Sequence, residues 1–226
     1  MAEIMKNEPC GVLLVNKHKG VTSHDIVYKI RKLYGTKKVG HTGTLDPLAT
    51  GVLVVLIGRA AKAAEYLVCD SKKYRATMRL GLTSDSEDIM GNILTESTDI
   101  PDCERVRSIC AEFVGDIKQI PPMYSALKVD GRKLVDLARE GKTVERQARD
   151  ITVYSLDVTA TDSKTDYILD VYCSSGTYIR TLCADIGARI GCGAVMAELE
   201  RREAGGFDIE NSHRIEKLEK MSEVER

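Results

Sequence analysis

The order of the predicted strands and helices restricts the fold of this chain more than any other feature of its sequence. Apolar runs at 11–15 and 52–57 indicate buried strands, and the apolar residues of 22–34 recur at helical spacing. Strands predicted at 151–158 and 167–173 follow one another without a helix between them. Strict alternation of strand and helix is therefore absent, which favours an α+β fold over a doubly wound one.

Length and composition are typical of a globular protein. With 226 residues and 43% hydrophobic side chains, residues 1–226 are predicted to form a single domain, with or without an insertion. The sequence shows neither a long apolar run nor a secretory signal, so we expect no membrane span and a cytoplasmic location. Its seven cysteines lack CxxC spacing and its four histidines lack an HExxH motif, so we expect no disulfide framework and no metal.

The net charge of −1 does not by itself indicate a nucleic-acid partner. The charges are unevenly distributed, because acidic residues concentrate at 85–104 and after 208. Basic clusters lie at 17–19, 37–38, 72–75, 132–133 and 201–202. Together they could form one basic face, although each cluster alone is more typical of a solvated surface.

The segment 119–150 differs from the rest of the chain. It is rich in Lys, Arg and Gly, and only a short helix around 134–138 is predicted within it. We therefore expect an excursion from the core of the domain.

Other segments carry local signals. The alanine-rich residues 59–67 predict a helix, and 177–190 predict another that Gly191 ends. Residues 81–91 are acidic and loop-like. Two sets of apolar residues each predict one buried face: that of a strand, by Tyr74, Ala76, Met78 and Leu80, and that of a C-terminal helix, by Ile215, Leu218 and Met221.

The loop from Gly40 to Gly51 is the best candidate for chemistry. It has no hydrophobic period, and it carries Asp46 between Leu45 and Pro47 ahead of an apolar strand. A carboxylate on a loop that glycine and proline constrain is well placed to act as a nucleophile or general base. An aspartate before proline that only turns the chain is an equally good reading of these residues alone. A phosphate cradle is a third reading, but the motifs GxxxxGK[ST] and GxGxxG are missing.

The stretch GHTGTLDPLATGVL at 40–53 closely resembles the catalytic motif GHxGxLDPxAxGxL of the TruB family of tRNA pseudouridine synthases. It is also similar to the motif of the dyskerin-type enzymes. Six further blocks resemble family motifs in the same order: VNKHKGVTS at 15–23, KYRA at 73–76, GLTSDSEDIMG at 81–91, QIPPMYSALKVDG at 119–131, SGTYIRTL at 175–182 and LERREAGGF at 199–207. The resemblance covers about 11–207.

The resemblance implies a pseudouridine synthase fold. In that fold a mixed, largely antiparallel central sheet is flanked by helices, and 119–150 is a thumb-like insertion that grips RNA. It also implies an isomerase that detaches one uracil in the T-loop of tRNA, rotates it and rejoins it through carbon, with no cofactor. The expected partner is tRNA, and the expected state is a monomer.

The resemblance also assigns three catalytic residues. Asp46 matches the family nucleophile, and Arg180 matches the arginine that pairs with that carboxylate. Tyr74 matches the tyrosine that stacks on the flipped base. For Arg180 the alternative is a surface salt bridge, and for Tyr74 it is packing in the core.

Further residues are implied to contact the RNA or the uridine. His41 would meet the RNA during base flipping, and Leu199 would line the uracil pocket; a histidine bonded to its own loop and plain core packing are the respective alternatives. The remaining predicted contacts are Lys17, Gly43, Leu45, Tyr178, Lys128 and Arg132. Phosphate contacts in the insertion would come from Lys128, Arg132, Lys133, Arg139, Lys142, Arg146 and Arg149.

The sequence departs from the family pattern at a few positions. His18 stands where proline is usual, Glu200 replaces a cation, and Leu134 stands where tyrosine is frequent. A short acidic helix follows 208, and no C-terminal PUA domain is expected. Two alternatives to a stand-alone tRNA enzyme are a catalytically vestigial tRNA-binding paralogue and a dyskerin-type synthase guided by RNA.

Overall fold

The computed structural model describes residues 8–64 and 70–221. Its contacts divide the chain into two compact units. Unit 1 consists of Met1–Lys73 and Glu200–Arg226, and unit 2 consists of Tyr74–Leu199. Strands β4 (Ser71–Leu80) and β12 (Ala194–Ala204) run from one unit into the other.

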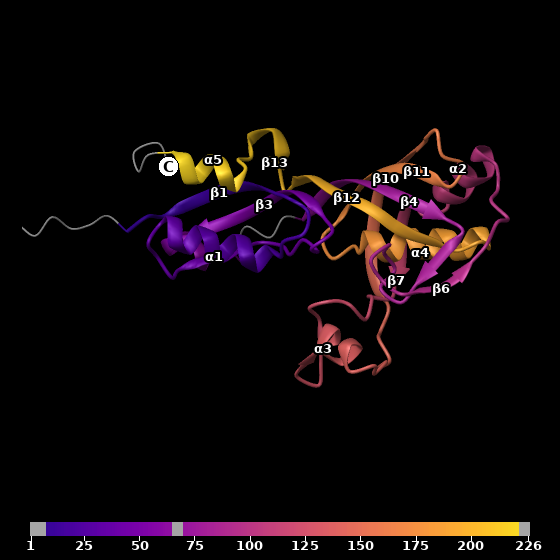
Figure 1. Ribbon diagram of the computed structural model, residues 1–226, viewed down its shortest axis with the longest axis horizontal. Helices are drawn as coiled ribbons and strands as arrows, with labels where there is room; N and C mark the ends of the chain where they lie inside the picture. The colour runs from indigo at the N-terminus through magenta and orange to yellow at the C-terminus, as the bar shows by residue number, and fades with distance from the viewer. Residues whose placement is uncertain (1–7, 65–69, 222–226) are drawn as a thin grey trace, which may run out of the picture. The chain divides into compact units, whose positions relative to one another are not determined.

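Strand β3 (Thr50–Ile57) is the central strand of unit 1 (Figure 1). The other elements that lie wholly in unit 1 are β1 (Gly11–Lys17), α1 (Ser23–Leu33), β2 (Val39–His41), the 3-10 helix η1 (Gly58–Ala63), β13 (Phe207–Asp208), the 3-10 helix η2 (Ile209–Asn211) and α5 (Ile215–Lys220). Strand β3 pairs antiparallel with β1 and β2, and parallel with β12 at Thr50 and Gly51. Neighbouring strands and packed side chains cover its apolar residues, which are almost fully buried.

Local sequence explains the helices of unit 1. Thr22 caps α1, because its hydroxyl accepts from the Asp25 N–H while the Asp25 carboxylate accepts from the Thr22 N–H. Helix α5 packs against α1 and β1 through the buried Ile215 and Leu218, the face that the sequence predicted.

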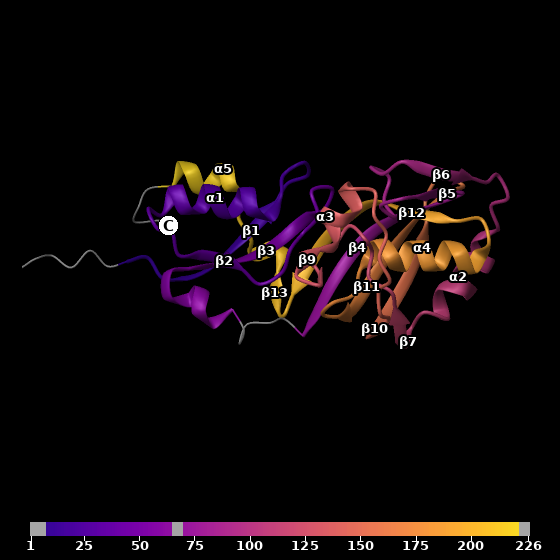
Figure 2. The ribbon, with the colours of Figure 1, turned by 90° about the horizontal axis from the view of Figure 1, so that it is seen from below.

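Unit 2 is a sheet with helices on one face (Figures 1 and 2). Its further elements are β5 (Leu82–Ser84), β6 (Ile93–Glu96), α2 (Cys103–Ala111), β7 (Gly115–Gln119), β8 (Lys128–Val129), β9 (Arg132–Lys133), α3 (Leu134–Arg139), β10 (Arg149–Ala160), β11 (Asp166–Ser174) and α4 (Ile179–Ile190). The strand order is β12-β4-β11-β10-β7. Tyr74, Ala76, Met78 and Leu80 are buried on one face of β4, as their alternation predicted.

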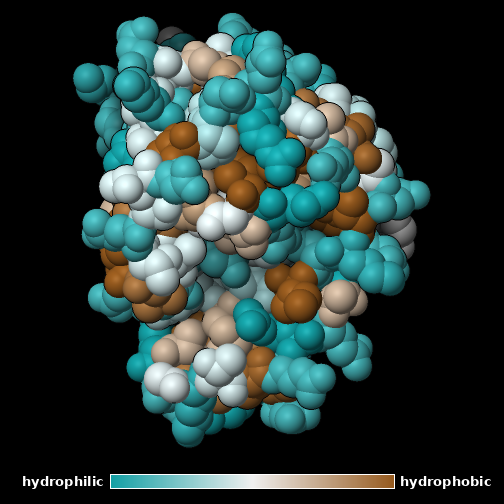
Figure 3. Space-filling view, turned by 90° about the vertical axis from the view of Figure 1, so that its right-hand side faces the viewer, coloured by the Kyte–Doolittle hydropathy of each residue, from teal (hydrophilic) through white to brown (hydrophobic). Residues whose placement is uncertain are grey.

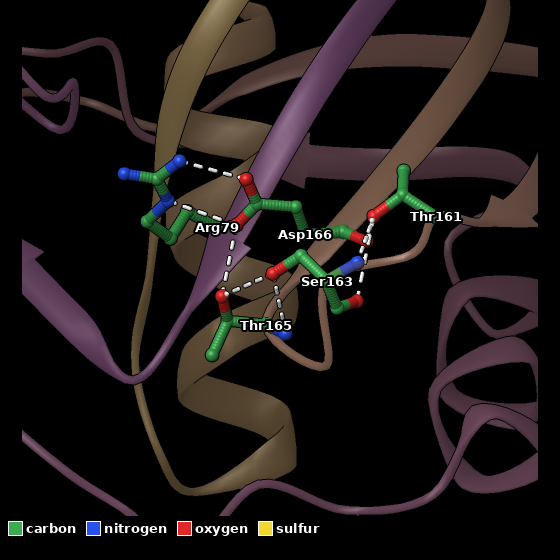
Figure 4. A network of polar contacts seen from close by, with 5 residues as sticks. All are labelled: Arg79, Thr161, Ser163, Thr165 and Asp166. Carbon is green, nitrogen blue, oxygen red and sulfur yellow. Dashed lines mark hydrogen bonds and ion pairs between the residues drawn. The ribbon is translucent and has the colours of Figure 1, made fainter.

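The other face of this sheet is polar. Arg79 on β4 makes two hydrogen bonds, of 2.8 and 2.7 Å, to the Asp166 carboxylate on β11 (Figure 4). Thr165 and Ser163, in the turn between β10 and β11, extend this network. The paired guanidinium and carboxylate fix the register of β4 against β11 on a solvated face.

Residues 120–148, called the insertion from here on, leave unit 2 between β7 and β10. Gln119 and Arg149, at its two ends, are register partners in the antiparallel pair. The insertion therefore starts and finishes at one place on the sheet, and α3 projects away from the strands (Figure 1). Leu134 and Leu137 are buried within it.

The α+β fold class and the mixed, largely antiparallel sheet are as predicted from the sequence. The helix predicted at 59–67 is present as a 3-10 helix over Gly58–Ala63, and 65–67 lie outside the described residues. Short strands at Val39–His41, Ile93–Glu96 and Gly115–Gln119 were missed.

The described residues contain no helix that combines the length and the apolar character needed to cross a membrane. On the face shown in Figure 3, apolar residues form separate patches among hydrophilic ones. Such scattered apolar surface is ordinary for a folded protein.

Candidate active site

The loop at 42–49 between β2 and β3, called the Asp46 loop, carries the predicted nucleophile. Asp46 is half-buried, whereas Leu45, Leu48 and Ala49 are buried and anchor the loop. The Ala49 N–H donates to the Asp46 carbonyl at 3.1 Å, which closes a turn. The carboxylate is thus held on a folded loop with a partly open side.

A serine at the start of α1 fastens the loop from one side. The Ser23 hydroxyl accepts from the Leu45 N–H at 2.8 Å and donates to the Leu45 carbonyl at 3.0 Å. Ser23 is buried, and it is available for this contact because the neighbouring Thr22 supplies the helix cap. Two opposite hydrogen bonds fix the backbone directly before Asp46.

An arginine on β12 fastens the same loop from another side. Arg201 is 1% exposed, and its guanidinium donates to the carbonyls of Val52 at 2.8 Å, Gly43 at 3.0 Å and Thr44 at 3.4 Å. The forked geometry of a guanidinium suits three carbonyls that lie apart from one another.

Sequence reasoning gave Arg201 no role, although strand alternation contained the signal. Leu199 and Arg201 lie two residues apart on β12 and are both buried. Arg202 is exposed and pairs with Glu200 at 2.7 Å, so the predicted loss of a cation at 200 produces a surface ion pair.

Two glycines permit this close packing. A Cβ on Gly51, which has φ +101°, would lie 2.2 Å from the Arg201 carbonyl oxygen. A Cβ on Gly43 would lie 3.4 Å from Nη1 of Arg201, which leaves little room for a larger residue. Glycine is therefore required at 51, where both the backbone angle and the space exclude a side chain.

Lys17, at the end of β1, is fully buried. Its ammonium donates to the carbonyls of Val21 at 2.8 Å, His18 at 3.1 Å and Pro47 at 3.4 Å. Burial lowers the pKa of Lys17 to about 8, and the Asp46 carboxylate acts in the opposite direction. The ammonium thus organises the loop, while its predicted contact with RNA stays a prediction.

His41 ends β2 and is partly buried. Burial lowers its pKa below 6.5, and the nearby Arg201 and His24 side chains lower it further. The imidazole is therefore neutral near pH 7. Its Nδ1 is buried and has no hydrogen-bond partner within the part of the chain that the structure describes.

In unit 2, Arg180 lies in the first turn of α4 and is 5% exposed. Its guanidinium donates to the carbonyls of Ser86 at 3.0 Å and Tyr124 at 2.8 Å. The Asp88 carboxylate lies 3.8 Å away, and sequence reasoning gave that residue no role. The surface salt bridge considered for Arg180 is wrong, because the side chain is buried.

The residues on either side of Arg180 are also held. Gln119 hydrogen-bonds to both main-chain groups of Tyr178, accepting at 2.8 Å and donating at 3.1 Å. The Thr181 hydroxyl donates to Glu87 at 2.5 Å. Glu87 has φ 64°, and burial raises the pKa of its carboxyl. Hydrogen bonds at Tyr178, Arg180 and Thr181 thus define the start of α4.

The other predicted residues of unit 2 have mixed exposure. Tyr74 and Leu199 are both buried, on β4 and β12. Lys128 and Arg132 are exposed on the β8–β9 hairpin, and Arg132 pairs with Glu140. Their contacts with uridine or phosphate stay predictions.

The structure groups the predicted site residues by unit. In unit 1 the Asp46 loop and its surroundings contain Lys17, His41, Gly43, Leu45 and Asp46. In unit 2, Tyr178 and Arg180 start α4, and the pairing of Arg180 with Asp46 stays a prediction. Among the described residues, no group of three His, Cys, Asp or Glu side chains is placed to hold a metal ion.

Two family models match the chain. The model described as TruB family pseudouridylate synthase (N terminal domain) matches residues 31–179. The model described as tRNA pseudouridylate synthase B C-terminal domain matches residues 180–226.

Curated relatives cover nearly the whole chain. A protein of Alkaliphilus oremlandii (strain OhILAs) named tRNA pseudouridine synthase B is 46% identical over 215 residues, which are 95% of this chain and 72% of the relative. A protein of the same name from Clostridium novyi (strain NT) is 49% identical over 209 residues, with 92% and 72% covered.

Solved structures also resemble the chain. A chain of the Cbf5-Nop10-Gar1 complex is 33% identical with a TM-score of 0.68, and 88% of this chain matches 50% of that one. A chain from an H/ACA RNP bound to a substrate RNA containing 2'-deoxyuridine is 28% identical with a TM-score of 0.69, and 92% of this chain matches 52% of it.

Proposed function

The chain belongs to the TruB family of pseudouridylate synthases, and from this premise we propose that it converts uridine to pseudouridine in the T-loop of tRNA. The proposed nucleophile is Asp46, and no cofactor takes part. Relatives named tRNA pseudouridine synthase B, at 46% and 49% identity, favour tRNA as the substrate.

The observation that carries the proposal is the bracing of the Asp46 loop. Ser23, Arg201 and Lys17 together hydrogen-bond to main-chain groups on both sides of Asp46. A nucleophile fixed before substrate arrives loses little freedom at the moment of attack, which lowers the barrier. A loop aspartate that only turned the chain would not need two buried cations around it.

The other proposed roles follow from the chemistry of an extruded base. Tyr74 would stack on the uracil and offset the stacking lost on flipping, by about 1–3 kcal/mol. Arg180 would pair with Asp46 and orient its carboxylate. His41, whose imidazole is neutral, would meet the RNA during base flipping. Leu199 would pack against the detached uracil.

The test of this function is tritium release from tRNA labelled at C5 of uridine, without any added guide RNA. We expect release by the unmodified protein and none by Asp46→Asn, while tRNA affinity stays within about twofold. The matched control is Asp162→Asn, which changes an exposed aspartate in the β10–β11 turn and should retain full activity. Tritium release by Asp46→Asn at the unmodified rate would remove Asp46 from its role.

The same assay separates the alternatives. A catalytically vestigial tRNA-binding protein would bind tRNA without releasing tritium. A guided synthase would release tritium only after a guide RNA and partner proteins were added. Replacing the T-loop uridine by cytidine should abolish release, and persistent release would contradict the proposed position. Monomeric state and cytoplasmic location stay predictions.

A further inference from the structure

Helix α4, which carries Arg180, begins without a side-chain cap of its own. Its N-cap residue is Tyr178, and no side-chain cap hydrogen bond is made there. The first turn of a helix leaves main-chain N–H groups that need partners and a backbone direction that needs fixing. The exact direction of this first turn sets where the Arg180 guanidinium points.

A glutamine from another strand takes the place of the cap. Gln119, the last residue of β7, is 2% exposed. Its Oε1 accepts from the Tyr178 N–H at 2.8 Å, and its Nε2 donates to the Tyr178 carbonyl at 3.1 Å. One amide that bonds in opposite senses to one residue fixes both its position and its orientation.

The same stretch of chain also contacts Arg180 directly. Five residues after Gln119, the Tyr124 carbonyl accepts from Nη2 of Arg180 at 2.8 Å. Arg146, on the returning side of the insertion, donates to the Pro121 carbonyl at 3.0 Å and ties the two sides together. The end of β7 therefore contacts the start of α4 at Tyr178, and the adjoining insertion contacts it at Arg180.

We propose that Gln119 is a positioning residue for Arg180 and that it links the base of the insertion to the active site. Gln119 is the residue at which the insertion joins the sheet. If the insertion moves when RNA binds, the Gln119 amide transmits that movement to the start of α4. The role concerns the rate of the chemical step more than the binding of tRNA. It rests on the proposed function, since it requires Arg180 to act on the reacting nucleoside.

The decisive variant is Gln119→Glu, because protonation switches its hydrogen bonds. A carboxylate still accepts from the Tyr178 N–H but repels the Tyr178 carbonyl. A protonated carboxyl accepts with one oxygen and donates with the other, as the amide does. Because position 119 is 2% exposed and faces the Tyr178 carbonyl, burial should raise the pKa of the new carboxyl above its ordinary value. We expect kcat to fall about tenfold at pH 8 and to recover part of this loss at pH 5.5, with KM for tRNA within about twofold.

The matched control is Asn211→Asp, the same amide-to-carboxylate change at an exposed position of unit 1. Its kcat should follow that of the unmodified protein at both pH values. Expressing Gln119→Glu as a ratio to this control removes the pH dependence of the reaction itself. A ratio that does not change between pH 8 and 5.5 would overturn the proposal.

A second, uncharged variant tests the proposal in case Gln119→Glu does not fold. Gln119→Met keeps a similar volume and removes both hydrogen bonds, so kcat should fall about tenfold at both pH values without recovery in acid. An unaltered kcat in Gln119→Met contradicts the proposal, as does a loss confined to KM. If the unmodified protein releases no tritium, the proposed function fails; if it does and both variants match it, only this inference fails.

Discussion

Lys17 and Arg201 are both cations with almost no exposed surface, and both direct their hydrogen bonds at main-chain carbonyls around Asp46. Burying a charge is costly unless hydrogen bonds and an opposite charge compensate it. Here the carbonyls provide the hydrogen bonds, and the Asp46 carboxylate favours the charged form of Lys17. Two cations beside one loop therefore keep the surroundings of Asp46 electropositive.

The buried ammonium of Lys17 gives a pH dependence with a definite sign. Its pKa falls from 10.5 to about 8 on folding, so between these values the unfolded chain binds more protons and stability rises with pH. The free energy of unfolding, measured relative to Lys17→Met, should therefore increase by on the order of 2–3 kcal/mol from pH 8 to 10.5.

Urea denaturation at a series of pH values measures this difference. Lys164→Met, at an exposed lysine of the β10–β11 turn, is the control and should show a flat difference over the same range. A Lys17→Met difference that is equally flat would mean that Lys17 is not held as a buried cation.

At this scale the sequence motif predicted a role for Asp46 but not the hydrogen bonds that hold its loop. Ser23 and Arg201 lie 22 and about 150 residues from the groups they bind, so only the folded chain brings them together. The alternation of Leu199 and Arg201 on one strand face was the available signal. Asp88 was not recognised, because the acidic segment 81–91 that contains it was interpreted as a loop.

At the scale of elements, the parallel contact between β3 and β12 depends on one glycine. A Cβ at Gly51 would collide with the main chain of Arg201, and φ +101° adds backbone strain. We expect Gly51→Ala to lower the free energy of unfolding by about 3 kcal/mol or more. Thermal denaturation is the measurement.

Gly40→Ala provides the matched control for this element. Gly40 lies on β2, which pairs with the same strand β3, and a Cβ there would have no atom within 4 Å. Its effect should stay below about 1 kcal/mol. Equal losses for the two alanine variants would rule out the contact with β12 as the cause.

Elements whose own residues show a clear sequence pattern could be predicted. Helix α4 ends at Gly191, whose φ of 104° suits glycine alone, and the predicted alternation of β4 matches its burial. The type of the helix predicted at 59–67 could not be foreseen. Alanine favours helical structure in general, and so short a run gains too little from that preference to decide between an α-helix and the observed 3-10 helix. The pairs β5–β6 and β8–β9 were missed because strands of two to four residues depend on their partners more than on their own sequence.

At the scale of the whole molecule, a net charge of −1 gives no general attraction for tRNA. Affinity should depend on local cations, and the insertion supplies two exposed lysines, Lys128 and Lys133, directly opposite one another on β8 and β9. Like charges in that arrangement repel, so a phosphate between them would be stabilising.

Replacing both lysines by alanine should weaken tRNA binding and flatten its salt dependence. The slope of log K against log salt should fall in magnitude by roughly 1, because the contact with that phosphate is lost. Filter binding at several salt concentrations measures the slope. Lys164→Ala, also exposed, is the control; an unchanged slope in the double variant would remove these lysines from the RNA interface.

The register pairing of Gln119 with Arg149 has a consequence for engineering and for evolution. The insertion begins and ends at neighbouring positions of two paired strands. A tight hairpin could therefore replace it, or a foreign segment whose two ends lie equally close together could be grafted there. Homologues could therefore differ in the length and sequence of the insertion without a change in the sheet, provided that Gln119 is retained.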